Sequence, residues 1–170
     1  LLAILTQECN LGANVGQCFL TNPDTGAGVG KNTGTVFSNV MNPTRDVPVF
    51  FDITNKLQLN AFQTAVSCPI KGVKGYGGAM GPAQFIPSTW KIFETRLKSI
   101  LGHYANPWSP RDAFMASGMY LADLGAIGGS ASAQSRAACR YYGSGGATCY
   151  YGQSVAKLKS TIQTNIDLLQ

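Results

Sequence analysis

The chain has 170 residues, of which 45% are hydrophobic and 12% are charged, a composition that excludes an intrinsically disordered chain. The net charge is +5 and the basic residues are scattered, which allows loose attraction to a polyanion but predicts no nucleic-acid partner. No apolar run reaches the roughly 18 residues of a membrane span. We therefore expect one domain over residues 1–170, without a transmembrane segment. Because the sequence opens inside a predicted helix, we expect further residues upstream of it in the full protein.

The first predicted helix covers residues 1–11 and carries Glu8. Ile4 and Leu5 lie four and three positions before this residue, and Leu11 lies three after it, with Leu1 one turn before Ile4. Residues at these spacings share one face of a helix. A carboxyl group on such an apolar face has a raised pKa and becomes a candidate proton donor. The alternative is an ordinary helical glutamate that reaches water at the helix end.

The rest of the chain alternates between irregular stretches and helices. Residues 13–43 and 67–87 are rich in Gly, Asn, Thr and Pro and predict long loops. Helices are expected at 46–57, 88–101, 110–124 and 132–141, and from 154 towards the C-terminus, with Thr44, Ser88 and Ser109 as N-terminal signals. No alternating segment longer than about four residues predicts a strand. The fold class is therefore mainly α.

Two glutamates are present, and the second is Glu94 in the predicted helix 88–101. Lys98 follows it by four residues, a spacing that predicts an ion pair on the solvent side of the helix. This interpretation makes Glu94 a poor candidate for a second catalytic acid.

Five cysteines allow two disulfides. Cys139 and Cys149 flank a Gly-rich loop, and Cys18 and Cys68 flank a long loop region; these pairings leave Cys9 outside both bridges. Such bridges would indicate an oxidising compartment. The sequence contains no C-x-x-C motif, only one histidine and no phosphate-binding loop, so we expect neither a metal site nor a cofactor.

The segment GYGGAMGPAQFIPSTW, residues 75–90, is a second candidate functional motif. Its glycines, Gly81 among them, allow the backbone to approach another surface closely. Gln84 carries a donor and an acceptor that suit sugar hydroxyl or acetamido groups, and Phe85 offers an apolar face. The alternative is a Gly-rich turn in front of a helix.

Four segments occur in the order seen in lytic murein transglycosylases: ECNLG at 8–12, GYGGAMGPAQFIPSTW at 75–90, NPWSPRDAFMASGMYLADLGA at 106–126 and RYYGSGGATCYYGQSV at 140–155. The chain resembles most closely the membrane-bound lytic transglycosylase B family, and more distantly the soluble lytic transglycosylases and goose-type lysozymes. This resemblance implies a lysozyme-like fold, a peptidoglycan substrate, an extracytoplasmic location and no cofactor. It also implies cleavage of the β-1,4 bond between N-acetylmuramic acid and N-acetylglucosamine. We expect a monomer.

The resemblance also implies roles for individual residues. Glu8 opens the family's Glu-x-x-x-Gly motif, Gln84 corresponds to the glutamine of the Gly-rich motif, and residues 141–143 correspond to its Tyr-Asn-Gly motif. The implied substrate contacts are Gln84, Phe85, Tyr141, Tyr142, Tyr76, Met80 and Gly81. By analogy, a tyrosine hydroxyl is expected near Glu8 or the substrate acetamido group. Three positions depart from the family pattern: Cys9 replaces Ser or Thr, Tyr142 replaces Asn, and Gly75 replaces a polar residue.

The implied mechanism needs one carboxyl group, whereas ordinary glycosidases use two. Glu8 would act first as acid and then as base, and the muramyl C6 hydroxyl would attack C1 to leave a 1,6-anhydro sugar. A goose-type muramidase, which acts through water, is the first alternative, with Asp46 and Asp52 as the only candidates for a second carboxylate. An inactive wall-binding or phage-structural module is the second. Phe50 and Phe51 fit either a substrate groove or the core.

Overall fold

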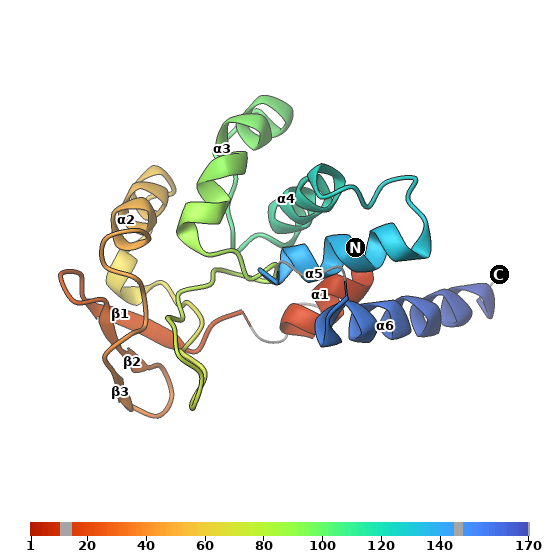
Figure 1. Ribbon diagram of the computed structural model, residues 1–170. Coiled ribbons are helices and arrows are strands. Elements are labelled where there is room, and N and C mark those ends of the chain that lie inside the picture. The colour runs from red at the N-terminus through yellow and green to blue at the C-terminus, as the bar shows by residue number, and fades with distance from the viewer. Residues whose placement is uncertain (11–14, 145–147, 170) are drawn as a thin grey trace.

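A computed structural model describes residues 1–10, 15–144 and 148–169. Within these ranges the chain is mainly helical and has one small sheet, as Figure 1 shows. The α-helices are α1 (Leu2–Cys9), α2 (Val47–Lys56), α3 (Pro87–Leu101), α4 (Pro110–Asp123), α5 (Ala131–Tyr141) and α6 (Tyr150–Asp167). The strands are β1 (Cys18–Asn22), β2 (Ala27–Gly30) and β3 (Val36–Phe37), and a 3₁₀ turn, η1, spans Ala61–Gln63. The sheet and α2 lie at one end of the molecule, and α1, α5 and α6 lie at the other. The mainly helical prediction is confirmed at this level.

The three-stranded sheet corrects the prediction that residues 13–43 are irregular throughout. Its strands pair antiparallel in the order β1-β2-β3, with Cys18 opposite Gly30. β1 is five residues long, and β2 is Gly-rich and gives little side-chain alternation. The tight turn between β1 and β2 is closed by the Asn22 side chain, whose Oδ1 accepts hydrogen bonds from the backbone of Asp24 and Thr25. These short strands lack the alternation of apolar and polar residues that marks a strand in a sequence. The side-chain hydrogen bonds of the turn and the packing against the rest of the protein stabilise them instead.

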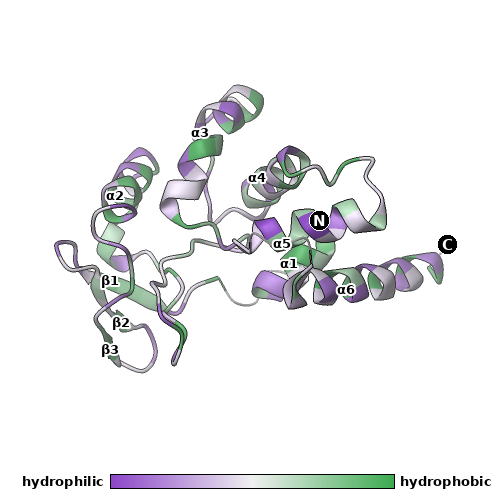
Figure 2. Cartoon of the chain, viewed as in Figure 1, coloured by the Kyte–Doolittle hydropathy of each residue, from purple (hydrophilic) through white to green (hydrophobic). Residues whose placement is uncertain are grey.

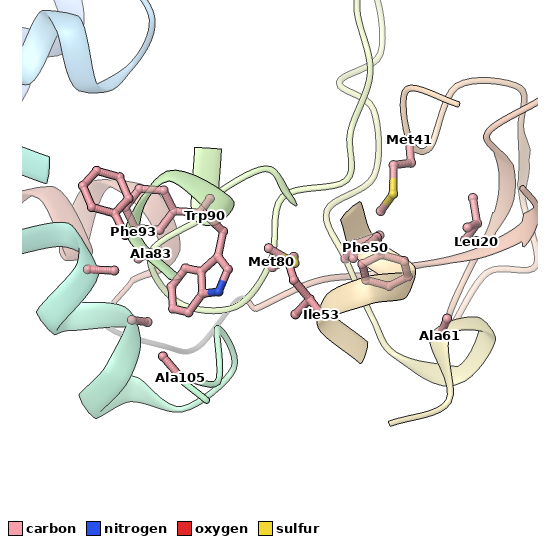
Figure 3. Close-up of a cluster of buried hydrophobic side chains, with 14 of the residues drawn as sticks. Leu20, Met41, Phe50, Ile53, Ala61, Met80, Ala83, Trp90, Phe93 and Ala105 are labelled. Atoms are coloured by element: carbon pink, nitrogen blue, oxygen red, sulfur yellow. The ribbon is translucent and has the colours of Figure 1, made fainter. Parts of the chain in front are cut away.

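The main core lies between α2, α3, α4 and the sheet (Figure 3). α3 turns Trp90, Phe93 and Leu97 into it, as the helical spacing predicted. Phe50 of α2 is fully buried in the same cluster, edge-on to the Trp108 ring at 6.3 Å, so the core interpretation holds for this residue. Phe51 is partly buried and packs edge-on against Phe62, with ring centroids 5.5 Å apart. Burial of these large side chains supplies most of the stability of this end of the molecule.

The helices α3 and α6 begin earlier than predicted, and in each a side chain distant in sequence or covalently bridged accepts a hydrogen bond from the first turn. α3 starts at Pro87, and its exposed backbone is capped by Asp46, whose Oδ1 accepts a hydrogen bond from Ser88 N at 3.1 Å. α6 starts at Tyr150, four residues before Ser154, with Cys149 Sγ accepting from Gly152 N at 3.1 Å. Such caps satisfy amide groups at helix starts.

The predicted Glu94–Lys98 pair is wrong. Glu94 pairs instead with Lys56 of α2 at 2.7 Å and with Lys91 of α3. Lys98 lies over the Tyr104 ring, 3.9 Å from its centroid. Because α2 packs against α3, it brings a cation from a different helix to Glu94, which helical spacing alone does not reveal.

Both predicted disulfides are present: Cys18–Cys68 and Cys139–Cys149. Cys9 Sγ donates to Leu5 O at 3.3 Å within α1. Across the described residues, no helix is long and apolar enough to cross a membrane. The same part of the chain contains no group of three or more His, Cys, Asp or Glu side chains arranged to hold a metal ion.

Candidate active site

Glu8 lies in the last turn of α1, which ends at Cys9 with Asn10 in the left-handed conformation. Ile4 and Leu5, on the same face one turn earlier, are buried, and the Glu8 side chain is half-buried. α1 packs against α6, beside α5 (Figure 1). The predicted placement of Glu8 on the apolar face is therefore seen. Leu11 and Gly12, the other residues of the proposed motif, lie outside the described ranges.

Tyr151, in the first turn of α6, donates a hydrogen bond from its hydroxyl to Glu8 Oε1. Burial raises the pKa of Glu8 above its ordinary value, and the Tyr151 hydrogen bond opposes this effect without cancelling it. Burial and the neighbouring Glu8 charge both raise the pKa of Tyr151. The tyrosine therefore stays a hydrogen-bond donor over the whole physiological range, while Glu8 holds its proton to a higher pH than a solvated glutamate.

A cavity of about 430 Å³ opens beside the Glu8 carboxyl group. Its lining consists of Gln7, Glu8, Tyr142, Ser144, Cys149, Tyr150 and Tyr151. The ring of Tyr142 stacks on that of Tyr151, with centroids 4.8 Å apart and planes 15° apart. Tyr150 is 86% exposed. The cavity thus presents two accessible aromatic rings next to one carboxyl group of raised pKa, a combination typical of sites that hold a ring-shaped polar substrate.

Tyr141, the last residue of α5, contacts the Gly-rich motif. Its hydroxyl donates to Ala83 O at 3.0 Å and hydrogen bonds with Ser117 Oγ at 2.8 Å. Burial, opposed by the Ser117 hydrogen bond, raises the Tyr141 pKa, and the Glu8 charge raises it further. Tyr141 is therefore close enough to Glu8 to sense its charge, but it does not line the cavity. Its position is that of a support between α5 and the turn that precedes α3.

Gln84 lies in a turn that its own side chain closes by a hydrogen bond to the backbone. Its Nε2 donates to Gly81 O at 2.7 Å, and its backbone has a φ of 54°. A side chain on Gly81 would collide with the carbonyl of Pro107, so this glycine serves close backbone packing. Neither residue lines the Glu8 cavity. The segment is thus a tight turn in front of α3, and sugar binding by Gln84 stays a prediction.

Two of the predicted substrate contacts lie in the core. Phe85 is 3% exposed, and Met80 is fully buried. The Phe85 ring packs among four other aromatic rings at centroid distances of 5.7 to 5.9 Å: Trp90, Phe93, Tyr120 and Tyr141. The motif folds inward between α3 and α4, so its apolar side chains face the protein rather than solvent.

The other candidates lie elsewhere. Tyr76 is exposed in the loop that follows Cys68 and is not among the residues lining the Glu8 cavity. Asp46 is buried and pairs with Arg45 at 2.6 Å in addition to capping α3. Asp52 pairs with Lys56 and Lys91 at 2.7 and 2.6 Å. Neither aspartate lines the cavity.

Sequence reasoning missed Tyr150 and Tyr151 as site residues, although it expected some tyrosine hydroxyl near Glu8. The signal was present in the repeated Tyr-Tyr-Gly of residues 141–143 and 150–152. The Cys139–Cys149 bridge joins the end of α5 to the start of α6 and so brings both tyrosine pairs to one place. The predicted Cys139–Cys149 bridge was the sequence feature that indicated that the two tyrosine pairs lie close together.

Comparisons of the chain with models of protein families, with curated proteins and with solved structures found no significant match. The chemistry of the site therefore rests on its geometry: a half-buried Glu8 carboxyl group, held by Tyr151, at a cavity with accessible aromatic rings.

Proposed function

We propose that this protein is a peptidoglycan lytic transglycosylase with a lysozyme-like fold. The observation that carries the proposal is the half-buried Glu8, whose pKa is raised and which faces a cavity lined by tyrosines. The order of the four motifs that resemble lytic murein transglycosylases supports the same reaction. The bond cleaved is the β-1,4 linkage between N-acetylmuramic acid and N-acetylglucosamine.

In the first half of the reaction Glu8 is the general acid. Because its pKa is raised, the carboxyl group keeps its proton to a higher pH than a solvated glutamate does, which favours proton donation to the glycosidic oxygen. The bond between C1 and that oxygen breaks, and the departing sugar leaves with the proton as a hydroxyl group. The acetamido group of the substrate assists the departure. The Tyr151 hydrogen bond holds the carboxyl group in one orientation during this step.

In the second half Glu8 is a carboxylate and acts as a base. It takes the proton from the C6 hydroxyl of the muramyl unit, and the C6 oxygen bonds to C1 to close the 1,6-anhydro ring. Glu8 is thereby protonated again and ready for another cycle. Attack from within the same sugar replaces water because the nucleophile is already held close and oriented. Tyr142 and Tyr150 offer ring faces against which a pyranose can pack.

The lack of a second carboxylate among the described residues that line the cavity favours this reaction over hydrolysis. Glu8 is the only carboxylate among the described residues that line the cavity, and the undescribed residues contain no Asp or Glu in their sequence. A water-activating mechanism generally needs a second carboxylate near the first. Asp46 and Asp52, its two candidates, are held by other partners.

The two disulfides support a location outside the cytoplasm, because such bridges persist in oxidising compartments. Peptidoglycan strands lie in the same compartment. We propose that the protein acts there as a monomer and needs no cofactor.

The test is digestion of purified peptidoglycan sacculi followed by mass spectrometry of the released muropeptides. We expect products that end in 1,6-anhydro-muramic acid, and none from the Glu8→Gln variant. Glu94→Gln is the matched control, because it removes the other glutamate of the chain and should cleave like the parent. Products with reducing muramic acid ends would instead establish a muramidase. Binding to sacculi without any cleavage by the parent would establish an inactive wall-binding module.

A further inference from the structure

Residues 70–76 form a loop that extends from the body of the protein beside the small sheet (Figure 1). Every residue of this run is exposed. Ile70 is 67% exposed and Val73 is 59% exposed, and Tyr76 presents its ring to solvent as well. Figure 2 shows hydrophobic, green-coloured residues where the loop extends beyond the sheet. Large aliphatic side chains gathered at the tip of a polar loop are uncommon on a protein surface that faces only water.

A disulfide and hydrogen bonds fix the base of the loop, so its exposed side chains have a defined position. The Cys18–Cys68 disulfide ties the segment that enters the loop to β1. On the other side Asn39 accepts from Gly77 N through its carbonyl at 3.2 Å, and its side-chain amide donates to Gly75 O. At the tip, Val73 N donates to Ile70 O at 3.1 Å. The apolar side chains are therefore presented by an anchored turn.

The charged residues of the loop are all positive. Lys71 and Lys74 alternate with the apolar residues, and both are exposed. The sequence contains no acidic residue between Asp52 and Glu94. The segment that carries Asn39 and holds the loop base also has none, from Thr25 to Arg45. The loop therefore suits a ligand that combines an apolar surface with negative charge.

We infer that residues 70–76 are a docking loop for the surface of a bilayer that contains anionic lipids. Ile70 and Val73 enter the boundary between headgroups and acyl chains, Tyr76 lies at the level of the headgroups, and the lysines contact lipid phosphates. Insertion stays shallow, because the backbone of a loop has amide groups that hydrocarbon cannot satisfy. The aliphatic residues favour a lipid surface over a purely polar anionic polymer. The inference is independent of the reaction proposed for Glu8.

The test is co-sedimentation of the whole protein with vesicles. We expect binding to vesicles of phosphatidylcholine mixed with phosphatidylglycerol, weaker binding at high salt, and little binding to phosphatidylcholine alone. The double change Lys71→Glu and Lys74→Glu should lower the partition coefficient by more than about tenfold. The same two charge reversals at Lys98 and Lys157, exposed on α3 and α6, should leave most of the binding intact.

A second pair of variants tests the apolar contribution. Ile70→Ser with Val73→Ser should lower the partition coefficient by about tenfold, whereas Ile127→Ser, at an exposed isoleucine in another loop, should not change it. Equal binding by the parent and the Lys71/Lys74 variant overturns the inference. So does binding of the parent to a poly(glycerol phosphate) polymer but not to the anionic vesicles, since the anionic partner is then a wall polymer.

Discussion

The two glutamates of this chain lie in regions with opposite electrostatics. Glu8, at the α1–α6 end, is surrounded by apolar side chains and tyrosines, and burial raises its pKa. Glu94, at the α2–α3 end, is 13% exposed. Burial alone would raise the Glu94 pKa too, but hydrogen bonds from Lys56 and Lys91 outweigh burial and lower it. The same type of side chain thus has a raised pKa in one region and a lowered pKa in the other, because lysines pair with Glu94 whereas a tyrosine hydroxyl contacts Glu8.

The contrast extends to packing. The region around α3 buries the Gly-rich motif in the main aromatic core, whereas the smaller cluster around Ile4 and Tyr151 leaves Tyr150 and Tyr142 accessible. The Gly-rich segment therefore contributes to the core, while the half-buried Glu8 carboxyl group lies on α1. Variants of the two regions should separate activity from stability.

Glu8→Gln should have the largest effect on activity. Removing the proposed general acid is expected to lower the cleavage rate on sacculi by about 10³-fold. Folding should be preserved, because glutamine is neutral and of similar shape. Since the pKa of Glu8 is raised in the folded state, its stabilising contribution is lost as pH rises through that value. The variant should thus melt at an equal or higher temperature than the parent at pH 8. Wild-type cleavage by the variant would mean that Glu8 is not the acid.

Phe85→Ala should have the largest effect on stability. The loss of a buried ring that contacts four others is expected to reduce the free energy of unfolding by about 3–5 kcal/mol, measured by denaturant titration. Tyr150→Ala is the control, since Tyr150 is exposed and its loss should change this free energy by less than about 0.5 kcal/mol. A stable Phe85→Ala protein that no longer binds glycan would restore Phe85 as a substrate contact.

Tyr151→Phe should change the pH dependence of cleavage. The tyrosine hydroxyl stabilises the ionised form of Glu8, so its removal raises the Glu8 pKa further. The alkaline limb of the pH–rate profile should move to higher pH, and the rate at the optimum should fall about tenfold as the carboxyl group loses its orientation. A limb that moves to lower pH would contradict the assigned hydrogen bond.

Glu94→Gln should lower stability by about 1 kcal/mol without affecting cleavage, because the ion pairs with Lys56 and Lys91 lie near the surface. The pKa of Glu94 is lowered in the folded state. Its contribution is therefore present above the unfolded-state pKa and lost as pH falls through the folded-state value. The difference between parent and variant in free energy of unfolding should consequently disappear at acidic pH, which denaturant titrations at two pH values can check.

Gln84→Ala should have the smallest effect. Loss of the hydrogen bond to Gly81 O is expected to cost about 1 kcal/mol of stability, with KM for soluble glycan fragments unchanged. A higher KM at unchanged stability would instead favour the sugar-binding interpretation of Gln84.

The parts of the fold that follow from local spacing were predictable from the sequence. The face of α3 and the apolar side of α1 repeat at helical intervals, and the cysteines flank loops that they close. The sheet was not predictable, because strands of two to five residues carry too little alternation. The hydrogen bond between Glu8 and Tyr151 spans 143 residues, and the inward turn of Phe85 depends on α4. Such tertiary contacts leave no periodic pattern in the sequence.

The most direct test of the central claim is an NMR titration of the protein labelled with carbon-13 at the glutamate side-chain carboxyl group. Only two glutamates are present, so two titrating signals are expected, and Glu94→Gln assigns them. We expect the Glu8 signal to titrate above the ordinary value of about 4.3 and the Glu94 signal below it. A Glu8 carboxyl group that titrates at or below that ordinary value would contradict the assignment of Glu8 as the proton donor.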